Sequence, residues 1–210
     1  MGAEPVTSRG SYRPNFAGAW EKDFNRSDSW EKELTRQLEQ RRRDAERGRN
    51  DAGLGPVISS GSGRGGAGIV DLAQLAGYVN RQTIMRIYQS QDEIKVEKEG
   101  DADLICSTDL DAEATFESEF GREACGWDGR QLVFRIVLPE GVEILHRFSV
   151  SDDREWLNMA TSVSNGAANP FTLIQFFRRY EAPGEDFSCI HTITRGNSCS
   201  LREAQRNDRQ

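Results

Sequence analysis

Three polar side chains in the second half of the chain have the types and spacing that could bind or transform a ligand. His146, Asn158 and Gln175 each stand between two apolar residues, in the patterns Ile-x-His-x-Phe, Trp-x-Asn-x-Ala and Leu-x-Gln-x-Phe. Alternate side chains of a strand share one face, so these patterns predict three polar groups pointing into one apolar interior. A few placed polar atoms in an apolar pocket typically orient a ligand's head group. The alternatives are an internally satisfied hydrogen-bond network, or a register that turns one of the three outward.

A histidine-based catalytic triad would have to use His146 or His191, and neither has a local catalytic signature around it. The chain has no nucleophile elbow, HExxH, P-loop or CxxC motif. An isomerase or cyclase that uses His146 as acid or base is therefore kept as an alternative to simple binding. Cys189, His191 and Cys199 lack the paired spacing typical of zinc ligands, so we predict no metal and no cofactor.

The four cysteines do not define a pairing from sequence alone. Cys106, Cys125, Cys189 and Cys199 permit three connectivities. A bridge between Cys189 and Cys199 would close a short loop in an oxidising compartment, and reduced thiols are the alternative. The first residues do not resemble a signal peptide. The protein is therefore expected in the cytoplasm, or in the periplasm or secreted if an exporting segment has been removed.

Composition excludes some partners. The chain has 210 residues and a formal net charge of −7, with 36% hydrophobic and 29% charged residues. Neutralising phosphates needs a basic face, so we predict no nucleic-acid partner. No apolar run approaches the roughly 20 residues of a membrane helix, so we predict no transmembrane segment. A chain of this length can form a single all-β domain, and its oligomeric state is left open.

Two helices are predicted before the hydrophobic pattern becomes strand-like. The first covers about residues 28–47, with Asp28 as its cap and apolar side chains at every fourth residue, namely Trp30, Leu34 and Leu38. Past Leu38 it is charged nearly all round. The second, residues 69–79, is nearly all apolar and should be buried or cover an opening.

Short alternating segments separated by tight turns follow the helices, with Asp128-Gly129 the strongest hairpin turn. An open meander of this width would leave two exposed edges, which closure removes. We therefore predict an all-β fold, a closed or nearly closed up-and-down antiparallel barrel of about 8–10 strands with two helices between the first and second strands. The predicted strands are 16–23, 84–89, 93–98, 103–109, 113–120, 122–127, 130–138, 142–150, 154–163 and 171–180.

The predicted barrel domain covers residues 15–181. A flexible lead, residues 1–14, precedes it, and a mobile tail, residues 182–210, follows it. The segment between the helices, residues 48–68, is a glycine-rich linker. It contains a Gly-x-Gly-x-x-Gly match, but no strand precedes the match, so we do not predict a dinucleotide site there.

The Gly18-Ala19-Trp20 sequence on the first strand, followed by helices and a β-meander, resembles the calycin superfamily. The likeness is to bacterial lipocalin-like proteins and, in element order, to fatty-acid-binding proteins. In calycins a first-strand Trp plugs one end of the barrel and an Arg of the last strand lies over it. The resemblance therefore implies that Trp20 is the plug and that Arg178 or Arg179 covers it. The long glycine-rich insert departs from the family pattern.

The same resemblance implies a binding protein that holds a small hydrophobic molecule, such as a lipid, in the barrel interior. An interaction module without ligand is a further alternative, and a barrel interior filled by side chains would favour it. The side chains expected to line a binding cavity are, besides the three polar residues, Phe116, Phe134, Ile136, Ile144, Phe148, Leu173 and Phe177.

Overall fold

The structure, a computed structural model, describes residues 13–51, 68–107, 114–166, 169–181, 187–192 and 196–201. The chain divides into two compact units, residues 1–179 and 180–210. Predictions for the lead and the glycine-rich linker therefore fall mostly outside the described residues. Within the described ranges, neither helix combines the length and apolarity that a membrane crossing requires.

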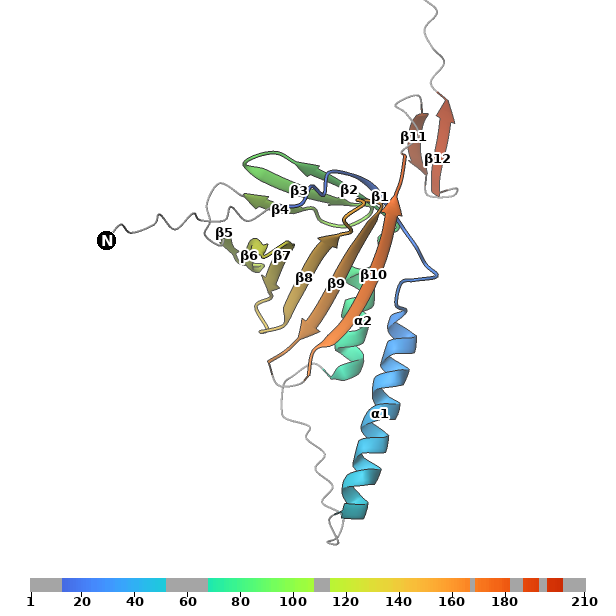
Figure 1. The fold of residues 1–210 in the computed structure, drawn as a ribbon, viewed down its shortest axis with the longest axis vertical. Helices are drawn as coiled ribbons and strands as arrows, with labels where there is room; N and C mark the ends of the chain where they lie inside the picture. Colours follow the sequence, from blue (N-terminus) through green and yellow to red (C-terminus); the bar gives the residue numbers. More distant parts are fainter. Residues whose placement is uncertain are drawn as a thin grey trace, which may run out of the picture. The chain divides into compact units, whose positions relative to one another are not determined.

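Ten antiparallel strands of the first unit form one strongly curled sheet, a half-barrel (Figure 1). This confirms the predicted all-β antiparallel fold with two helices between the first and second strands. Their order is β4-β3-β2-β1-β10-β9-β8-β7-β6-β5, so β1 lies between β2 and β10 and joins the two ends of the meander. The strands are β1 (Gly18–Lys22), β2 (Ile84–Gln89), β3 (Glu93–Lys98), β4 (Leu104–Ser107), β5 (Ala114–Ser118), β6 (Gly121–Asp128), β7 (Gln131–Val137), β8 (Glu143–Val150), β9 (Trp156–Ser164) and β10 (Phe171–Arg179).

A disulfide joins the two sides of the curled sheet where backbone pairing does not. Cys106 of β4 and Cys125 of β6 are bonded, with their Cα atoms 5.7 Å apart, and both side chains are buried. Strand β4 pairs only with β3 in the sheet order, and β6 pairs with β5 and β7. The covalent link therefore closes the seam between β4 and β6.

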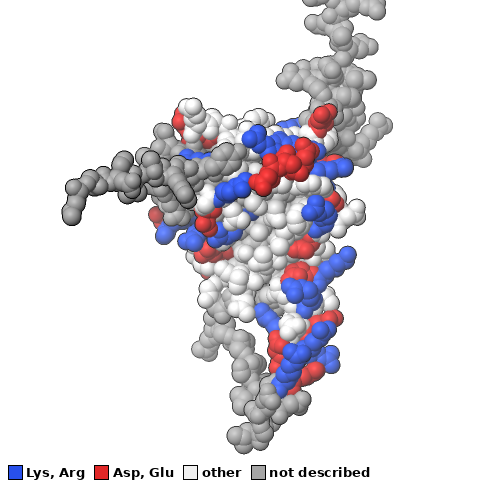
Figure 2. Space-filling view, viewed as in Figure 1, with Lys and Arg blue, Asp and Glu red and all other residues white. Residues whose placement is uncertain are grey.

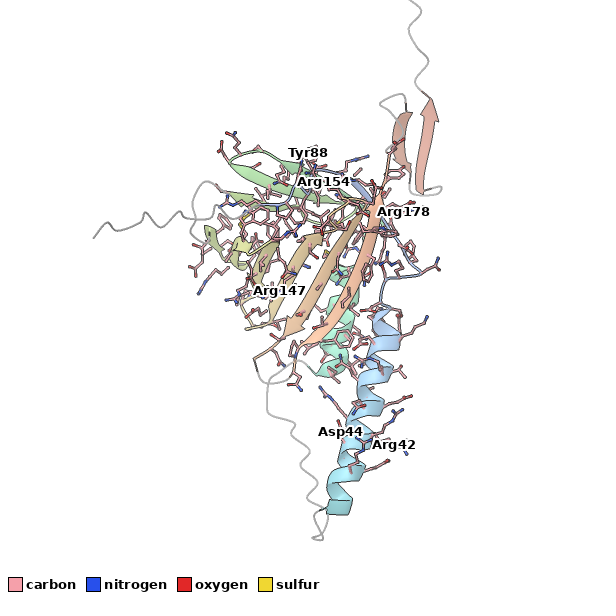
Figure 3. All side chains as sticks on the ribbon, viewed as in Figure 1. Arg42, Asp44, Tyr88, Arg147, Arg154 and Arg178 are labelled. Atoms are coloured by element: carbon pink, nitrogen blue, oxygen red, sulfur yellow. A yellow bond between two sulfur atoms is a disulfide. The ribbon has the colours of Figure 1, made fainter. Side chains whose placement is uncertain are left out.

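The Gly-x-Trp sequence of β1 places Trp20 in the core beneath an arginine of β10, the contact that the resemblance led us to expect. Trp20 is fully buried, and its indole N–H donates to the carbonyl oxygen of Phe16 at 3.0 Å. The guanidinium carbon of Arg179 lies 4.1 Å from the Trp20 ring centroid. Arg178 instead pairs with Glu21 on the outer face, at 2.9 Å, and its label in Figure 3 marks this end of β10. Arg179 is thus the residue that covers the plug.

Gly18 is required by this arrangement. Its φ of +136° is a conformation that L-residues rarely adopt. A Cβ atom at this position would lie 1.8 Å from Nη1 of Arg179, so any side chain would displace the guanidinium from the Trp20 ring.

The short helix α2 (Ile69–Val79) lies against β9 and β10 (Figure 1). Its buried residues Leu72, Ala73 and Ala76 join Phe171 and Leu173 of β10 in one apolar cluster. The helix covers the concave side of the sheet and contacts α1 on another side, whereas its apolar residues Val70 and Tyr78 remain 44% and 59% exposed.

The long helix α1 (Trp30–Asp51) begins beside Ser29, whose hydroxyl oxygen accepts a hydrogen bond from the Lys32 backbone N–H at 3.5 Å. The prediction that Asp28 caps this helix is wrong, because the Asp28 carboxylate accepts the backbone N–H of Ile174 in β10 at 2.7 Å. Residues 39–47 of the helix are exposed, and charges of both signs interleave along them (Figure 2).

The second unit is a hairpin of β11 (Phe187–Thr192) and β12 (Gly196–Leu201). The sequence predicted a mobile tail for residues 182–210 and no strands within it. Cys189 is the Cα partner of Cys199 in this hairpin, and His191 is the partner of Asn197.

Candidate functional site

The concave side of the sheet carries a polar layer, made of His146, Thr161 and Gln175, between two apolar clusters. Each of the three residues is at most 1% exposed and lies on a different strand, β8, β9 or β10. Each of the three has an apolar neighbour two positions away on either side along its strand. The neighbours in the cluster under α2 are Ile144, Val163 and Leu173. The neighbours in the cluster around Trp20 are Phe148, Met159 and Phe177. The sequence predicted two of these three inward positions, His146 and Gln175.

The third predicted member, Asn158, faces the other way. On β9 the buried positions are Leu157, Met159, Thr161 and Val163, and Asn158 is only partly buried. The inward assignment of Asn158 is therefore wrong, and Thr161 occupies the place across from His146 in the register. The signal that could have found it is the run of Leu, Met and Val at alternate positions, which is more apolar than Trp, Asn and Ala.

A hydrogen-bonded chain runs through the polar layer to the end of α2. Nδ1 of His146 lies 2.9 Å from the Thr161 hydroxyl, and that hydroxyl donates to Oδ1 of Asn80 at 2.9 Å. The Asn80 side-chain amide donates in turn to the Ala76 carbonyl at 2.7 Å. Because the Thr161 hydrogen is used on Asn80, Nδ1 of His146 must be the donor to Thr161.

Burial lowers the pKa of His146 to about 3, and the nearby charge of Lys98 contributes in the same direction. His146 is thus neutral near pH 7. The neutral, buried imidazole donates its Nδ1 hydrogen to Thr161 and so links β8 to β9 through a side-chain hydrogen bond. His146 lines neither of the two cavities described below.

Among the side chains predicted to line an interior cavity, five are buried in the packed core, and two of these, Phe134 and Leu173, also border one of the cavities described below. Phe148, Leu173 and Phe177 are at most 1% exposed, and Phe134 meets Phe148 edge to face with ring centroids 5.9 Å apart. Ile144 is also buried. Their inward orientation agrees with the predicted strand faces.

Phe116 is the exception, because its side chain is 65% exposed. It lies on β5, the edge strand of the sheet, where no further strand covers it. The expectation that Phe116 is enclosed in the barrel interior is therefore wrong.

A cavity of about 420 Å³, here called the seam cavity, opens beside the disulfide between the two edges of the sheet. It brings together three of the predicted lining residues, Phe116, Phe134 and Ile136. Ile105 of β4, itself 54% exposed, contributes a further apolar wall. The rest of its lining is Asp103, Ser107, Thr115, Glu123, Ala124, Cys125 and Arg135.

A second cavity of about 270 Å³, here called the helix cleft, lies where the end of β1, the start of α1, the end of α2 and β10 meet. Its lining includes Lys22, Trp30, Asn80, Leu173 and Gln175. Sequence reasoning predicted Leu173 and Gln175 as ligand contacts but found no role for Lys22.

Among the residues whose side chains are described, no three of the His, Cys, Asp and Glu side chains gather as a group that could hold a metal ion. The positions of Cys189, His191 and Cys199 are known only as backbone partners in the hairpin.

No protein-family model matches the chain, and no curated protein matches it. Two solved structures show a distant likeness, both from Ramazzottius varieornatus. A secretory abundant heat soluble (SAHS) protein is 13% identical with a TM-score of 0.42, covering 81% of this chain and 100% of its own. Secretory abundant heat soluble protein 4 is 15% identical with a TM-score of 0.41, covering 82% of this chain and 100% of its own. At these TM-scores the fold assignment rests on the strand order and register of this chain.

Proposed function

We propose that this protein binds a small apolar molecule and that the seam cavity is the binding site. The observation that carries the proposal is the cavity of about 420 Å³, walled by Ile105, Phe116, Phe134 and Ile136. Its volume lies within the range typical of small-molecule sites, which are mostly apolar with a few polar groups.

The exposure of two wall residues supports an apolar ligand. Ile105 and Phe116 are 54% and 65% exposed, although the other large apolar residues of the sheet are mainly buried. Each 100 Å² of apolar surface that a ligand removes from water contributes about 2.5 kcal/mol. Removing these two side chains from water would therefore contribute substantially to the free energy of ligand binding.

The charged groups of the cavity support a ligand without a strong charge of its own. Asp103 pairs with Lys95 at 3.1 Å, and Arg135 pairs with Glu143 at 3.3 Å. Asp103 and Arg135 each already have an ionic partner, so a charged head group would have to compete for them, and the third charged lining residue, Glu123, would repel an anion. A neutral polar group at the rim avoids that competition.

The packed interior weighs against placing the ligand at His146 and, taken alone, favours the interaction module without ligand; the open seam cavity is the observation that favours binding instead. That residue is 1% exposed and hydrogen-bonded to Thr161, and its apolar neighbours Ile144 and Phe148 are in the core clusters. A ligand there would have to displace native side chains, whereas the seam cavity is already open.

The test is titration with the neutral fluorophore N-phenyl-1-naphthylamine. We expect the wild type to bind it, and an Ile105→Ser/Phe116→Ser variant to bind at least tenfold more weakly. Phe120→Ser is the matched control, because Phe120 is 77% exposed in the turn between β5 and β6 and does not line the cavity. Absence of binding by the wild type, or equal affinities of the double variant and the control, would refute the proposal. Native mass spectrometry of the purified protein would in addition weigh any retained ligand.

A further inference from the structure

The helix cleft contains a half-buried lysine without a negative partner. Lys22 shares the inward face of β1 with Trp20, and its ammonium donates to the Asn80 carbonyl oxygen at 2.7 Å. The ion pairs found among the described side chains do not include Lys22. Asp28 lines the same cleft, but its carboxylate accepts the backbone N–H of Ile174.

This environment disfavours the charged form of Lys22. Burial lowers its pKa to about 8, and no nearby carboxylate opposes that effect. An anion entering the cleft would supply the missing partner and stabilise the ammonium. A carboxylate matches this need, because it accepts the N–H groups that the Asn80 carbonyl leaves free.

Gln175 adds an unpartnered acceptor to the same cleft. Its Nε2 donates to the Asp28 carbonyl at 3.0 Å, which leaves Oε1 pointing elsewhere. This oxygen is buried and has no hydrogen-bond partner among the described residues, and the residue is 1% exposed. Buried acceptors are normally satisfied. Because this oxygen has almost no accessible surface, the Gln175 side chain must turn toward the cleft before an incoming O–H group can complete it.

Trp30 and Leu173 provide apolar walls beside these two polar groups. Gly77 of α2 allows Trp30 to lie close, because a Cβ on Gly77 would come within 2.4 Å of the indole ring. The cleft therefore offers two cations, one buried acceptor and an apolar surface in about 270 Å³. The second cation, Arg81, already donates to the Tyr78 and Gly100 carbonyl oxygens and pairs with Asp101, so Lys22 is the cation left for an anionic ligand.

We propose that the helix cleft binds a small hydroxycarboxylic acid. Its carboxylate pairs with Lys22, its hydroxyl donates to Oε1 of Gln175, and its carbon skeleton packs on Trp30 and Leu173. The helix cleft and the seam cavity share no lining residue, so this site is independent of the function proposed above.

The experiment is calorimetric titration with 2-, 3- and 4-hydroxybenzoate and 3-hydroxybutanoate. At least one of them should bind, and its analogue with an alcohol in place of the carboxylate should bind at least tenfold more weakly. Lys22→Met should lower the affinity at least tenfold, whereas Lys22→Arg, which keeps the charge, should retain most of it. Lys32→Met is the matched control on the exposed start of α1.

Gln175→Met separates the second contact from the first. In the wild type the hydroxylated acid should bind more tightly than the same acid without its hydroxyl, and in Gln175→Met the two affinities should become equal. Tryptophan fluorescence and urea unfolding of each variant report whether it remains folded. The proposal is overturned if none of the four acids binds, or if a folded Lys22→Met variant binds as well as the wild type.

Discussion

Removing the Cys106–Cys125 bridge tests how the curled sheet is closed. The bridge links β4 to β6, which are not neighbours in the strand order, so no ladder of backbone hydrogen bonds substitutes for it. It spans a sequence separation of 19 residues, and a cross-link of that length restricts the unfolded chain by about 3 kcal/mol. We therefore expect Cys106→Ala/Cys125→Ala to lower the free energy of unfolding by about 3 kcal/mol and the melting temperature by roughly 6–12 °C.

Urea unfolding followed by tryptophan fluorescence measures this loss. All four tryptophans lie within residues 1–179, so the signal reports the sheet and not the C-terminal hairpin. Cys189→Ala/Cys199→Ala is the matched control and should leave the transition unchanged. Wild-type protein in reducing buffer should unfold like the double variant at the seam, which separates loss of the bond from loss of two sulfur atoms. A loss below about 1 kcal/mol in both comparisons would show that the bridge does not constrain the unfolded chain as inferred.

Three further predictions concern single residues. Gly18→Ala should lower the free energy of unfolding, measured in urea, by about 1–3 kcal/mol, because φ at this position is positive and Arg179 occupies the space that the new methyl group needs. Gly100→Ala should lower it less, because φ is also positive there but the space around it is open. Arg179→Met should cost about 1 kcal/mol of cation–π energy, whereas Arg178→Met, at an exposed ion pair, should cost less than about 0.5 kcal/mol; equal losses would contradict the assignment of the plug. The pKa of His146 is lowered from 6.5 to about 3, so between these values only the unfolded chain takes up the proton and the folded state loses stability as pH falls. When the free energy of unfolding is measured at pH 7, 5 and 4, the wild type should lose up to about 1.4 kcal/mol per pH unit more than the His146→Asn variant. Equal slopes for the two proteins would refute the buried neutral state of His146.

The strand pattern was predictable because the sheet has one buried face. In β8 the buried residues Ile144, His146 and Phe148 alternate with partly buried ones, and this period of two reports the direction of each side chain. The two helices were predictable for the same reason, from the fourfold apolar spacing of the first and the nearly unbroken apolarity of the second. Trp20 as the plug also followed from the first strand and its resemblance.

Where both faces of a strand carry apolar residues, the alternation no longer decides. In β9 both faces carry apolar side chains, so the greater apolarity of Leu157, Met159 and Val163 is only a weak signal. The register with β8 decides that Thr161 rather than Asn158 lies beside His146. Likewise, nothing local distinguishes Phe116 from Phe134. Their exposure differs because β5 is an edge strand and β7 is not.

The amino-acid sequence by itself determined the order of the two helices and the ten strands of the sheet, and the inward face of most of those strands, since these depend on hydrophobic periodicity along a few neighbouring residues. Only the tertiary structure decided that Cys106 pairs with Cys125, that Arg179 rather than Arg178 covers Trp20, and that Lys22 and Gln175 share a cleft. Each of these depends on segments that are far apart in the chain meeting in space. Both candidate sites arise in that way, because a cavity is formed by the gap between elements and leaves no pattern within any one of them.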